Sequence, residues 1–389
     1  MACIRWIVRP EKGAPKGKCR IYVYLRKNKY QTELFRGTER EANRRAATLE
    51  HKKTEGTLIE PSRLTVGAYL DQWLAANPKG VSRRTLEGYS WLINKHLKPR
   101  FGDTPLAKLH PMDIQTYYQD TSRCDGKGKL SRQTVLHLHR LLHVALLSAV
   151  KNGLLAFNPA GTDRIDVPST DNNEEESKEM MTLDEKELLA LFKGFEGHRL
   201  YAPVVVDGTT GLRRGELLAL RWSDVNLDTA MLSVVRSLEE TKEFGLNFKP
   251  PKTKRSKRTI DIGSMTVETL RRHATAQKKA RLAAGPAWID EGLIFPTLDG
   301  SRWRPSSFTS AFIDRVRAVG FTGFRFQDLR HTHCSQLLRA GVPVMTVSAR
   351  LGHSSAKMTL DRYAHSLPAD QKRAALTLDT LLQAAALPG

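Results

Sequence analysis

Residues that could act together on a phosphodiester lie in short blocks of the C-terminal half of the chain. Residues 210–216 read TGLRRGE and include Arg213. Farther along, Arg330, His353 and Tyr363 stand 23 and then 10 residues apart. Guanidinium groups bind phosphate oxygens, and a tyrosine hydroxyl can form a covalent bond to phosphorus. The set therefore suits one kind of chemistry, the attack of a tyrosine on a phosphodiester.

Tyrosine is a poor nucleophile at neutral pH, because its unperturbed pKa is about 10. Surrounding cations or a base must favour the phenolate before it attacks. Arg213 and Arg330 are assigned to the phosphate, since a guanidinium keeps its charge and donates two parallel hydrogen bonds. Preorganised donors of this kind usually make the largest contribution to such catalysis.

The leaving 5′ oxygen needs a proton, and a lysine can supply it because its pKa falls among other cations. Lys252 is the first candidate and Lys254 the second. Both lie in a stretch with six basic residues between Lys249 and Arg258 and no acid, which we interpret as a hairpin tip. His353 precedes two serines that would cap the helix of Tyr363, so it is expected to hydrogen-bond the phosphate.

The sequence favours no metal or other cofactor. His331, His333 and Cys334 are close in sequence, but neighbours on a helix point to different sides. No cluster of Asp and Glu accompanies the basic blocks, which argues against a two-metal nuclease or transposase. The four cysteines show no Cys-x-x-Cys pairing, so reduced thiols are expected.

Composition points to a basic protein of several domains. The chain has 389 residues, which suggests two or three domains, and 62 Lys+Arg against 41 Asp+Glu give a net charge of +21. A polyanion is the expected partner, nucleic acid first and an anionic membrane second. Apolar runs fall short of the ~18 residues of a membrane span, and no signal peptide is visible. A soluble cytoplasmic protein is expected.

The first sixty residues predict a small sheet with one helix. Residues 3–8, 21–25 and 30–36 alternate apolar and polar positions, and Thr38 with Glu41 forms a capping box for a helix. This segment has 15 Lys+Arg, 7 Glu and no Asp. Two interpretations stay open, a sheet that lies in a DNA groove and a basic sheet that is merely solvated.

Residues 64–160 predict an all-helical domain, with helices at 65–76, 82–97, 111–120 and 131–152. A linker is expected at 161–179, where a proline, small polar residues and an acidic run occur without periodicity.

A mainly helical domain with a small antiparallel sheet is expected over 180–389. Its first helix, 183–193, would start at a capping box formed by Thr182 and Glu185. Helices at 199–207, from Arg213 to near Trp222, at 266–284 and at 305–319 surround strands at 230–237, 246–249 and 259–262. The fold class is thus multidomain α+β: a three-stranded sheet plus helix, a helical domain and this last domain.

The blocks resemble the tyrosine recombinase family, specifically the integrases of phages and integrative elements. TGLRRGEL at 210–217 is similar to the first arginine block of the family, DLRHT at 328–332 to the second and LGH at 351–353 to the third. Tyr363 takes the place of the nucleophile, and Lys252 that of the hairpin lysine. The likeness extends to an arm-type DNA-binding domain at 1–60, a core-binding domain at 64–160 and the catalytic domain at 180–389.

One position departs from the family pattern. The second block normally reads His-x-x-Arg, and Gln327 stands at the histidine position. Gln can hydrogen-bond a phosphate oxygen but cannot exchange a proton near neutral pH. His331 follows Arg330 directly and faces another side of the helix, so it is not assigned to the site.

The resemblance implies an enzyme for site-specific recombination, which integrates and excises a phage or mobile element through a 3′-phosphotyrosyl intermediate without ATP or metal. It implies double-stranded attachment sites, a tetramer on DNA, a host DNA-bending protein and an excisionase as partners, and a place at the bacterial nucleoid. An apolar stripe after Tyr363, within 369–389, could pack on a neighbouring protomer or on its own domain.

Two other functions are open from the sequence. A type IB topoisomerase uses the same catalytic logic to relax DNA without choosing a site. A catalytically inactive DNA-binding relative is the non-enzymatic alternative, with Gln327 as the first sign of decay.

Overall fold

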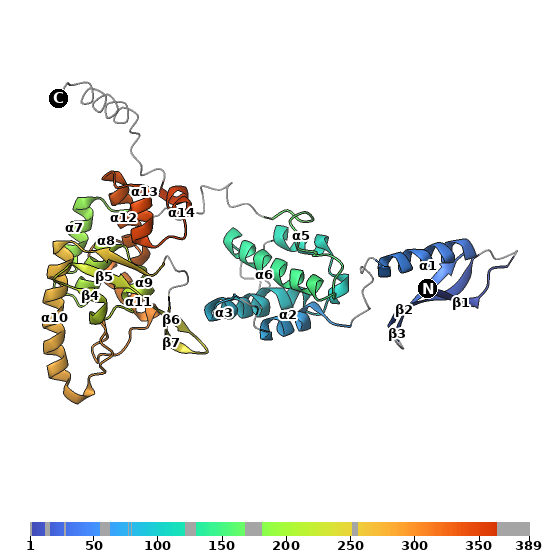
Figure 1. Ribbon diagram of the computed structural model, residues 1–389, viewed down its shortest axis with the longest axis horizontal. Coiled ribbons are helices and arrows are strands. Elements are labelled where there is room, and N and C mark those ends of the chain that lie inside the picture. The colour runs from blue at the N-terminus through green and yellow to red at the C-terminus, as the bar shows by residue number, and fades with distance from the viewer. Residues whose placement is uncertain are drawn as a thin grey trace, which may run out of the picture. The chain divides into compact units, whose positions relative to one another are not determined.

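The computed structural model describes residues 2–11, 16–26, 29–54, 63–76, 78, 80–120, 130–167, 181–250 and 256–363. The chain divides into two compact units, Met1–Glu174 and Glu175–Gly389, which we call the N-terminal and C-terminal units. Figure 1 shows the helices and strands of both units. Within the described ranges, no helix combines the length and the apolar character that crossing a membrane demands.

The N-terminal unit begins with an antiparallel sheet in the order β1-β2-β3, covered by a helix. The elements are β1 (Cys3–Val8), β2 (Gly17–Arg26), β3 (Lys29–Gly37) and α1 (Glu39–Thr54). Alternate residues of β2, such as Ile21 and Val23, pack against Ala42 and Ala46 of α1. Thr38 and Glu41 form the predicted capping box at the start of α1. The predicted sheet and helix are confirmed.

A helical part follows with its own apolar core. Its elements are α2 (Val66–Ala75), α3 (Arg83–Leu92), a π-helical turn (Ile93–Leu97), α4 (Lys98–Phe101), a 3₁₀ turn (Leu106–Lys108), α5 (Pro111–Asp120) and α6 (Arg132–Lys151). Hydroxyl side chains cap three of the helices, Thr65, Ser82 and Ser131. All four predicted helices are present. The packed segment extends to Ile165, beyond residue 160, because this side chain is buried in the same core.

The C-terminal unit is mainly helical around small antiparallel sheets. Its helices are α7 (Glu185–Gly194), α8 (Tyr201–Thr210), α9 (Arg214–Leu217), α10 (Ser264–Ala284), α11 (Pro305–Ala318), α12 (Phe326–Arg339), α13 (Val344–Leu351) and α14 (Ala356–Tyr363), with 3₁₀ turns at Trp222–Asp224 and Gly285–Ala287. Its strands are β4 (Val225–Asn226), β5 (Met231–Val234), β6 (Ser237–Thr241), β7 (Gly245–Lys249) and β8 (Arg258–Asp261). The predicted fold class is confirmed.

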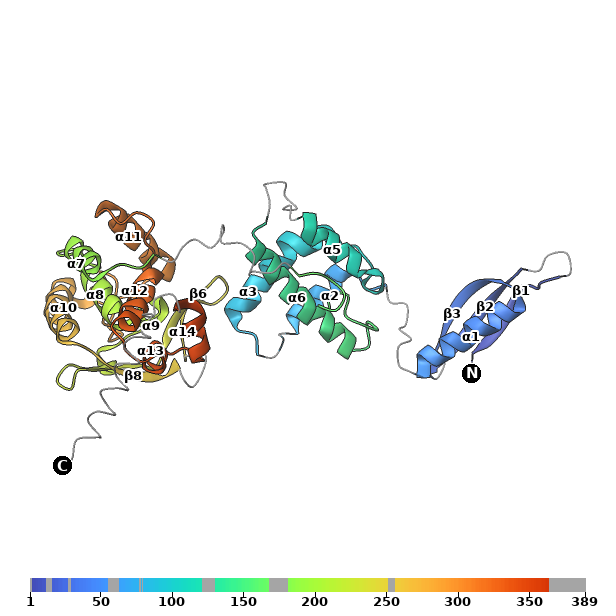
Figure 2. The same cartoon turned by 90° about the horizontal axis from the view of Figure 1, so that it is seen from above.

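The central helix of this unit is α8, which is apolar on nearly all sides and packs against α12 and α10. Helix α12 in turn contacts α13, which contacts α14. Helices α13 and α14 lie side by side in both views (Figures 1 and 2). This succession brings the segments that carry the candidate residues to one end of α8.

Several local predictions for this unit are wrong. The capping box of α7 is formed by Asp184 and Glu187, two residues after the predicted one, because the box pattern occurs twice in overlap. The second helix starts at Tyr201 and runs to Thr210. Helix α9 ends at Leu217, well before Trp222.

The basic stretch is not the tip of a hairpin. Strand β7 pairs with β6, whereas β8 pairs with β5 in the other sheet. Residues 250–257 therefore connect two different sheets. Lys252 and Lys254 lie outside the described residues.

Candidate active site

The first arginine block sits at a tight turn between α8 and α9. Gly211 ends α8 with a left-handed backbone, φ 65°. A Cβ at this position would come within 2.6 Å of Leu351 Cδ2 and 2.7 Å of His333 Cδ2. Glycine is thus required by its conformation and by the close approach of α12 and α13. The turn places Arg213 at the N-cap of α9.

Arg213 joins the first block to the third. Its Nη1 donates to Glu216 Oε1 at 2.8 Å and its Nη2 donates to the Gly352 carbonyl at 3.0 Å. The side chain is 39% exposed, although Glu216 is buried. Arg213 can therefore still meet a phosphate from solvent while its orientation is fixed by two partners.

Arg330 lies in the second turn of α12 and is more buried than Arg213, with 3% of the residue exposed. Its Nη1 donates to the Gly211 carbonyl at 2.5 Å and its Nη2 to the Leu351 carbonyl at 2.7 Å. Burial, together with the charge of Arg213, lowers the pKa of Arg330 to about 10. The guanidinium stays charged at neutral pH and ties the three blocks together.

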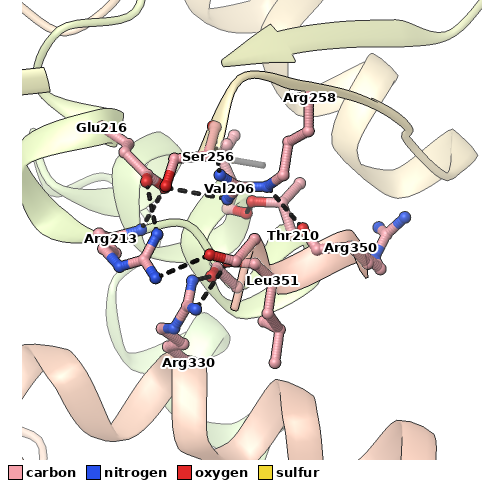
Figure 3. Close-up of polar contacts among 11 residues, drawn as sticks. Val206, Thr210, Arg213, Glu216, Ser256, Arg258, Arg330, Arg350 and Leu351 are labelled. Atoms are coloured by element: carbon pink, nitrogen blue, oxygen red, sulfur yellow. Dashed lines mark hydrogen bonds and ion pairs between the residues drawn. The ribbon is translucent and has the colours of Figure 1, made fainter. Parts of the chain in front are cut away.

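Glu216 and Arg258 complete a buried ionic network that sequence reasoning did not identify (Figure 3). Arg258 Nη2 donates to Glu216 Oε2 at 2.9 Å, and Arg258 Nε donates to the Arg350 carbonyl at 2.6 Å. Burial alone would raise the pKa of Glu216, but the hydrogen bond and charge of Arg258 and the charge of Arg213 lower it. Glu216 follows Arg213 by three residues at a helix start, and this spacing could have indicated the contact between Arg213 and Glu216.

Tyr363 lies at the end of α14 and is 2% exposed. Its ring packs in a small apolar cluster with Cys334, Leu338, Val347 and Leu351. Its hydroxyl is hydrogen-bonded to Nδ1 of His331, and the two ring centroids are 5.7 Å apart. Sequence reasoning set His331 aside because it faces another side of α12 than Arg330. The structure shows that Tyr363 approaches α12 on that other side.

His353 follows the turn that ends α13. Gly352 closes this helix with a left-handed backbone, φ 65°. His353 Nδ1 is hydrogen-bonded to Thr359 Oγ1 of α14 at 2.7 Å. The residue is therefore held next to the helix that carries Tyr363.

The structure brings four of the six predicted site residues to the junction of α8, α12, α13 and α14: Arg213, Arg330, His353 and Tyr363. Gln327 lies exposed in the first turn of α12, and Lys252 is outside the described residues. The described part of the chain has no group of three or more His, Cys, Asp or Glu side chains that could hold a metal ion. Two guanidinium groups held by such hydrogen bonds can bind the oxygens of a phosphodiester.

Comparison with protein families gives the same assignment. The phage integrase family model matches residues 178–370, and the model of the N-terminal SAM-like domain of phage integrases matches residues 65–122. The chain belongs to the tyrosine recombinase family. The matched range of the first model contains every predicted catalytic residue of this recombinase.

Two curated relatives match over most of their length. The tyrosine recombinase XerC-like protein of Caldanaerobacter subterraneus subsp. tengcongensis is 28% identical, covering 90% of this chain and 91% of its own. The ICEBs1 integrase of Bacillus subtilis is 26% identical, covering 90% of this chain and 93% of its own.

Solved structures share the fold. The Tn1549 transposon integrase in complex with a circular intermediate DNA has a TM-score of 0.68 at 21% identity, covering 81% of this chain and 99% of its own. A lambda integrase tetramer bound to a Holliday junction has a TM-score of 0.52 at 18% identity, covering 87% and 91%. At these identities the likeness establishes the fold of this recombinase.

The exposed position of Gln327 yields a prediction. Replacing Gln327 with His should leave single-turnover DNA cleavage at least as fast as in the parent, because the side chain faces solvent and the new imidazole can only add a proton-exchanging group. Cleavage of a nicked duplex under enzyme excess measures the rate. Gln327→Ala is the matched control, and a large loss in Gln327→His would show that the glutamine has a role of its own.

Proposed function

We propose that this recombinase integrates and excises a phage or mobile element by tyrosine attack on DNA phosphodiesters, through a 3′-phosphotyrosyl intermediate. One observation carries the proposal. Arg213 and Arg330 bond to the consecutive carbonyls of Gly352 and Leu351, at the turn that leads into the helix of Tyr363. The phosphate-binding groups and the nucleophile are thus positioned by one short segment.

The reaction uses these groups in sequence. Arg213 and Arg330 bind the non-bridging oxygens, with His353 as a further hydrogen-bond donor. Tyr363 gives up its hydroxyl proton to a base and its oxygen bonds to phosphorus, the bond from phosphorus to the 5′ oxygen breaks, and Lys252 protonates that oxygen. The phosphotyrosyl bond conserves the energy of the phosphodiester, so a 5′ hydroxyl of the partner strand can reverse the step without ATP.

The proposal extends to the other parts of the chain and to its partners. We assign residues 1–60 to arm-type DNA sites, 64–160 to the core site and 180–389 to catalysis. Strand exchange between two duplexes needs four protomers, and the lambda integrase tetramer on a Holliday junction supports such an assembly. Further proposed partners are a host DNA-bending protein and an excisionase at the bacterial nucleoid. The tail at 369–389, for which packing on a neighbouring protomer and packing on its own domain are both open, lies outside the described residues.

Covalent trapping tests this function. The full chain is incubated with a nicked duplex that carries the end junction of the genetic element encoding it, and the products are separated on a denaturing gel. A protein-linked DNA strand is expected with the junction duplex and not with a scrambled duplex. The absence of any adduct would support the inactive DNA-binding relative. Relaxation of a supercoiled plasmid that lacks the junction would instead support a type IB topoisomerase.

A further inference from the structure

We propose that His331 is the general base that removes the proton from Tyr363, an assignment that rests on the strand-cleavage function proposed above. The family's histidine position is occupied by Gln327, which cannot exchange a proton near neutral pH. His331 therefore supplies a function that this glutamine cannot.

The geometry places a basic nitrogen directly on the nucleophilic oxygen. Nδ1 of His331 is hydrogen-bonded to the hydroxyl of Tyr363, and both side chains are buried. A general base must lie within hydrogen-bond reach of the proton that it removes. His331 also stands four residues after Gln327, so it occupies the same side of α12 one turn farther along.

Burial restricts where the proton can go. Tyr363 is 2% exposed, so protein groups rather than bulk water surround most of this side chain. Cys334, which also hydrogen-bonds Tyr363, remains a neutral thiol because burial raises its pKa to about 12. Arg330, the neighbour of His331 on α12, is a cation with no acceptor atom. Of these groups in contact with Tyr363 or adjacent to His331, the imidazole alone can take the proton.

The O–H bond of Tyr363 breaks and its proton moves to Nδ1 of His331, while the phenolic oxygen bonds to phosphorus. The bond from phosphorus to the 5′ oxygen breaks, and Lys252 protonates that oxygen. The step requires the neutral imidazole with its proton on Nε2. In the reverse reaction His331 returns the proton to the departing phenolate.

A variant that keeps the hydrogen bond without the proton transfer tests the proposal. The amide oxygen of Asn stands close to the position of Nδ1 and accepts a hydrogen bond, but it is not basic. His331→Asn should reduce single-turnover cleavage of the nicked junction duplex by roughly 10²- to 10⁴-fold, the usual contribution of a general base. Binding of the same duplex in a gel shift should not change. His198→Asn is the control, because His198 lies before α8, away from the α12–α14 contact, and its Nδ1 accepts from the Leu200 amide.

A more acidic phenol at position 363 distinguishes two roles of His331, that of a general base and that of a packing residue. When 3,5-difluorotyrosine replaces Tyr363, less help is needed to form the phenolate, so the defect of His331→Asn should shrink by about 10-fold or more. An unchanged defect would overturn the proposal, since it would show that Asn only disturbs packing. Unchanged or faster cleavage in His331→Asn would also overturn it, because His331 would then merely hold the tyrosine back. His331→Gln provides a second variant if His331→Asn binds DNA poorly.

The two proposals fail in different ways. If the parent chain forms no covalent adduct, both the strand-cleavage function and the role of His331 are refuted. If the parent forms the adduct and His331→Asn matches its rate, only the role of His331 is refuted.

Discussion

Replacing Tyr363 with Phe should abolish the covalent protein–DNA adduct, with a loss on the order of 10⁴-fold or more, as when other enzymes lose their nucleophile. The ring should keep its place, because it packs against the apolar side chains of Leu338, Val347 and Leu351. The substitution removes the hydroxyl, which contacts His331 and Cys334. Losing the hydrogen bond between Tyr363 and His331 should cost about 1 kcal/mol of unfolding free energy.

The measurement is adduct formation on the nicked junction duplex, followed on a denaturing gel. A gel shift checks that the variant still binds this DNA. Tyr201→Phe serves as the matched control, since Tyr201 opens α8 and has no part in the site. If Tyr363→Phe still forms the adduct, another residue is the nucleophile and the assignment of Tyr363 is refuted.

Replacing Arg330 with Lys should slow cleavage by about 10²- to 10³-fold, the range expected when one preorganised donor of a transition state is lost. Lys keeps the positive charge, but one ammonium cannot bond the carbonyls of Gly211 and Leu351 and also present two parallel donors to a phosphate. DNA affinity should change little, because one phosphate contact is a small part of a large interface.

Arg339→Lys is the matched control for this prediction, since Arg339 lies exposed at the end of the same helix. Rates are compared under enzyme excess, and thermal unfolding checks the stability of each variant. If Arg330→Lys cleaves at the parental rate, the charge of this side chain is sufficient and its hydrogen-bonding geometry is not needed.

The sequence predicted the local elements well because their signals are local. Helix α1 starts where Thr38 and Glu41 predicted it, since a capping box involves residues three positions apart. The same rule failed at α7, where Thr182 and Asp184 both start a box pattern and only packing decides between them. The predicted strand pairing is also wrong, because a local pattern does not show which strands pair. The basic stretch 249–258 indicated a hairpin, but β7 pairs with β6, directly before it, and β8 pairs with β5.

Long-range contacts explain what the sequence left out of the site. The helical period correctly separated His331 from Arg330, yet it could not show that α14 would pack against the side of α12 that His331 occupies. Likewise, from the sequence alone Arg258 is only one of six basic residues in a stretch interpreted as a hairpin tip. Its partner Glu216 is 42 positions away, and only the folded chain buries the two together.

The ionic network around Glu216 also sets the charge balance of the reaction. Arg213, Arg258 and Arg330 each carry one positive charge and Glu216 carries one negative charge, which leaves a net of two positive charges. Burial raises the pKa of Asp207 well above its ordinary value, which disfavours a further negative charge beside this network. A phosphodiester brings one negative charge, whereas the pentacoordinate species formed by a phenolate carries two. The two positive charges of the network therefore exceed the single negative charge of the bound substrate and match the two negative charges of the pentacoordinate species. This charge match favours the transition state over the bound substrate.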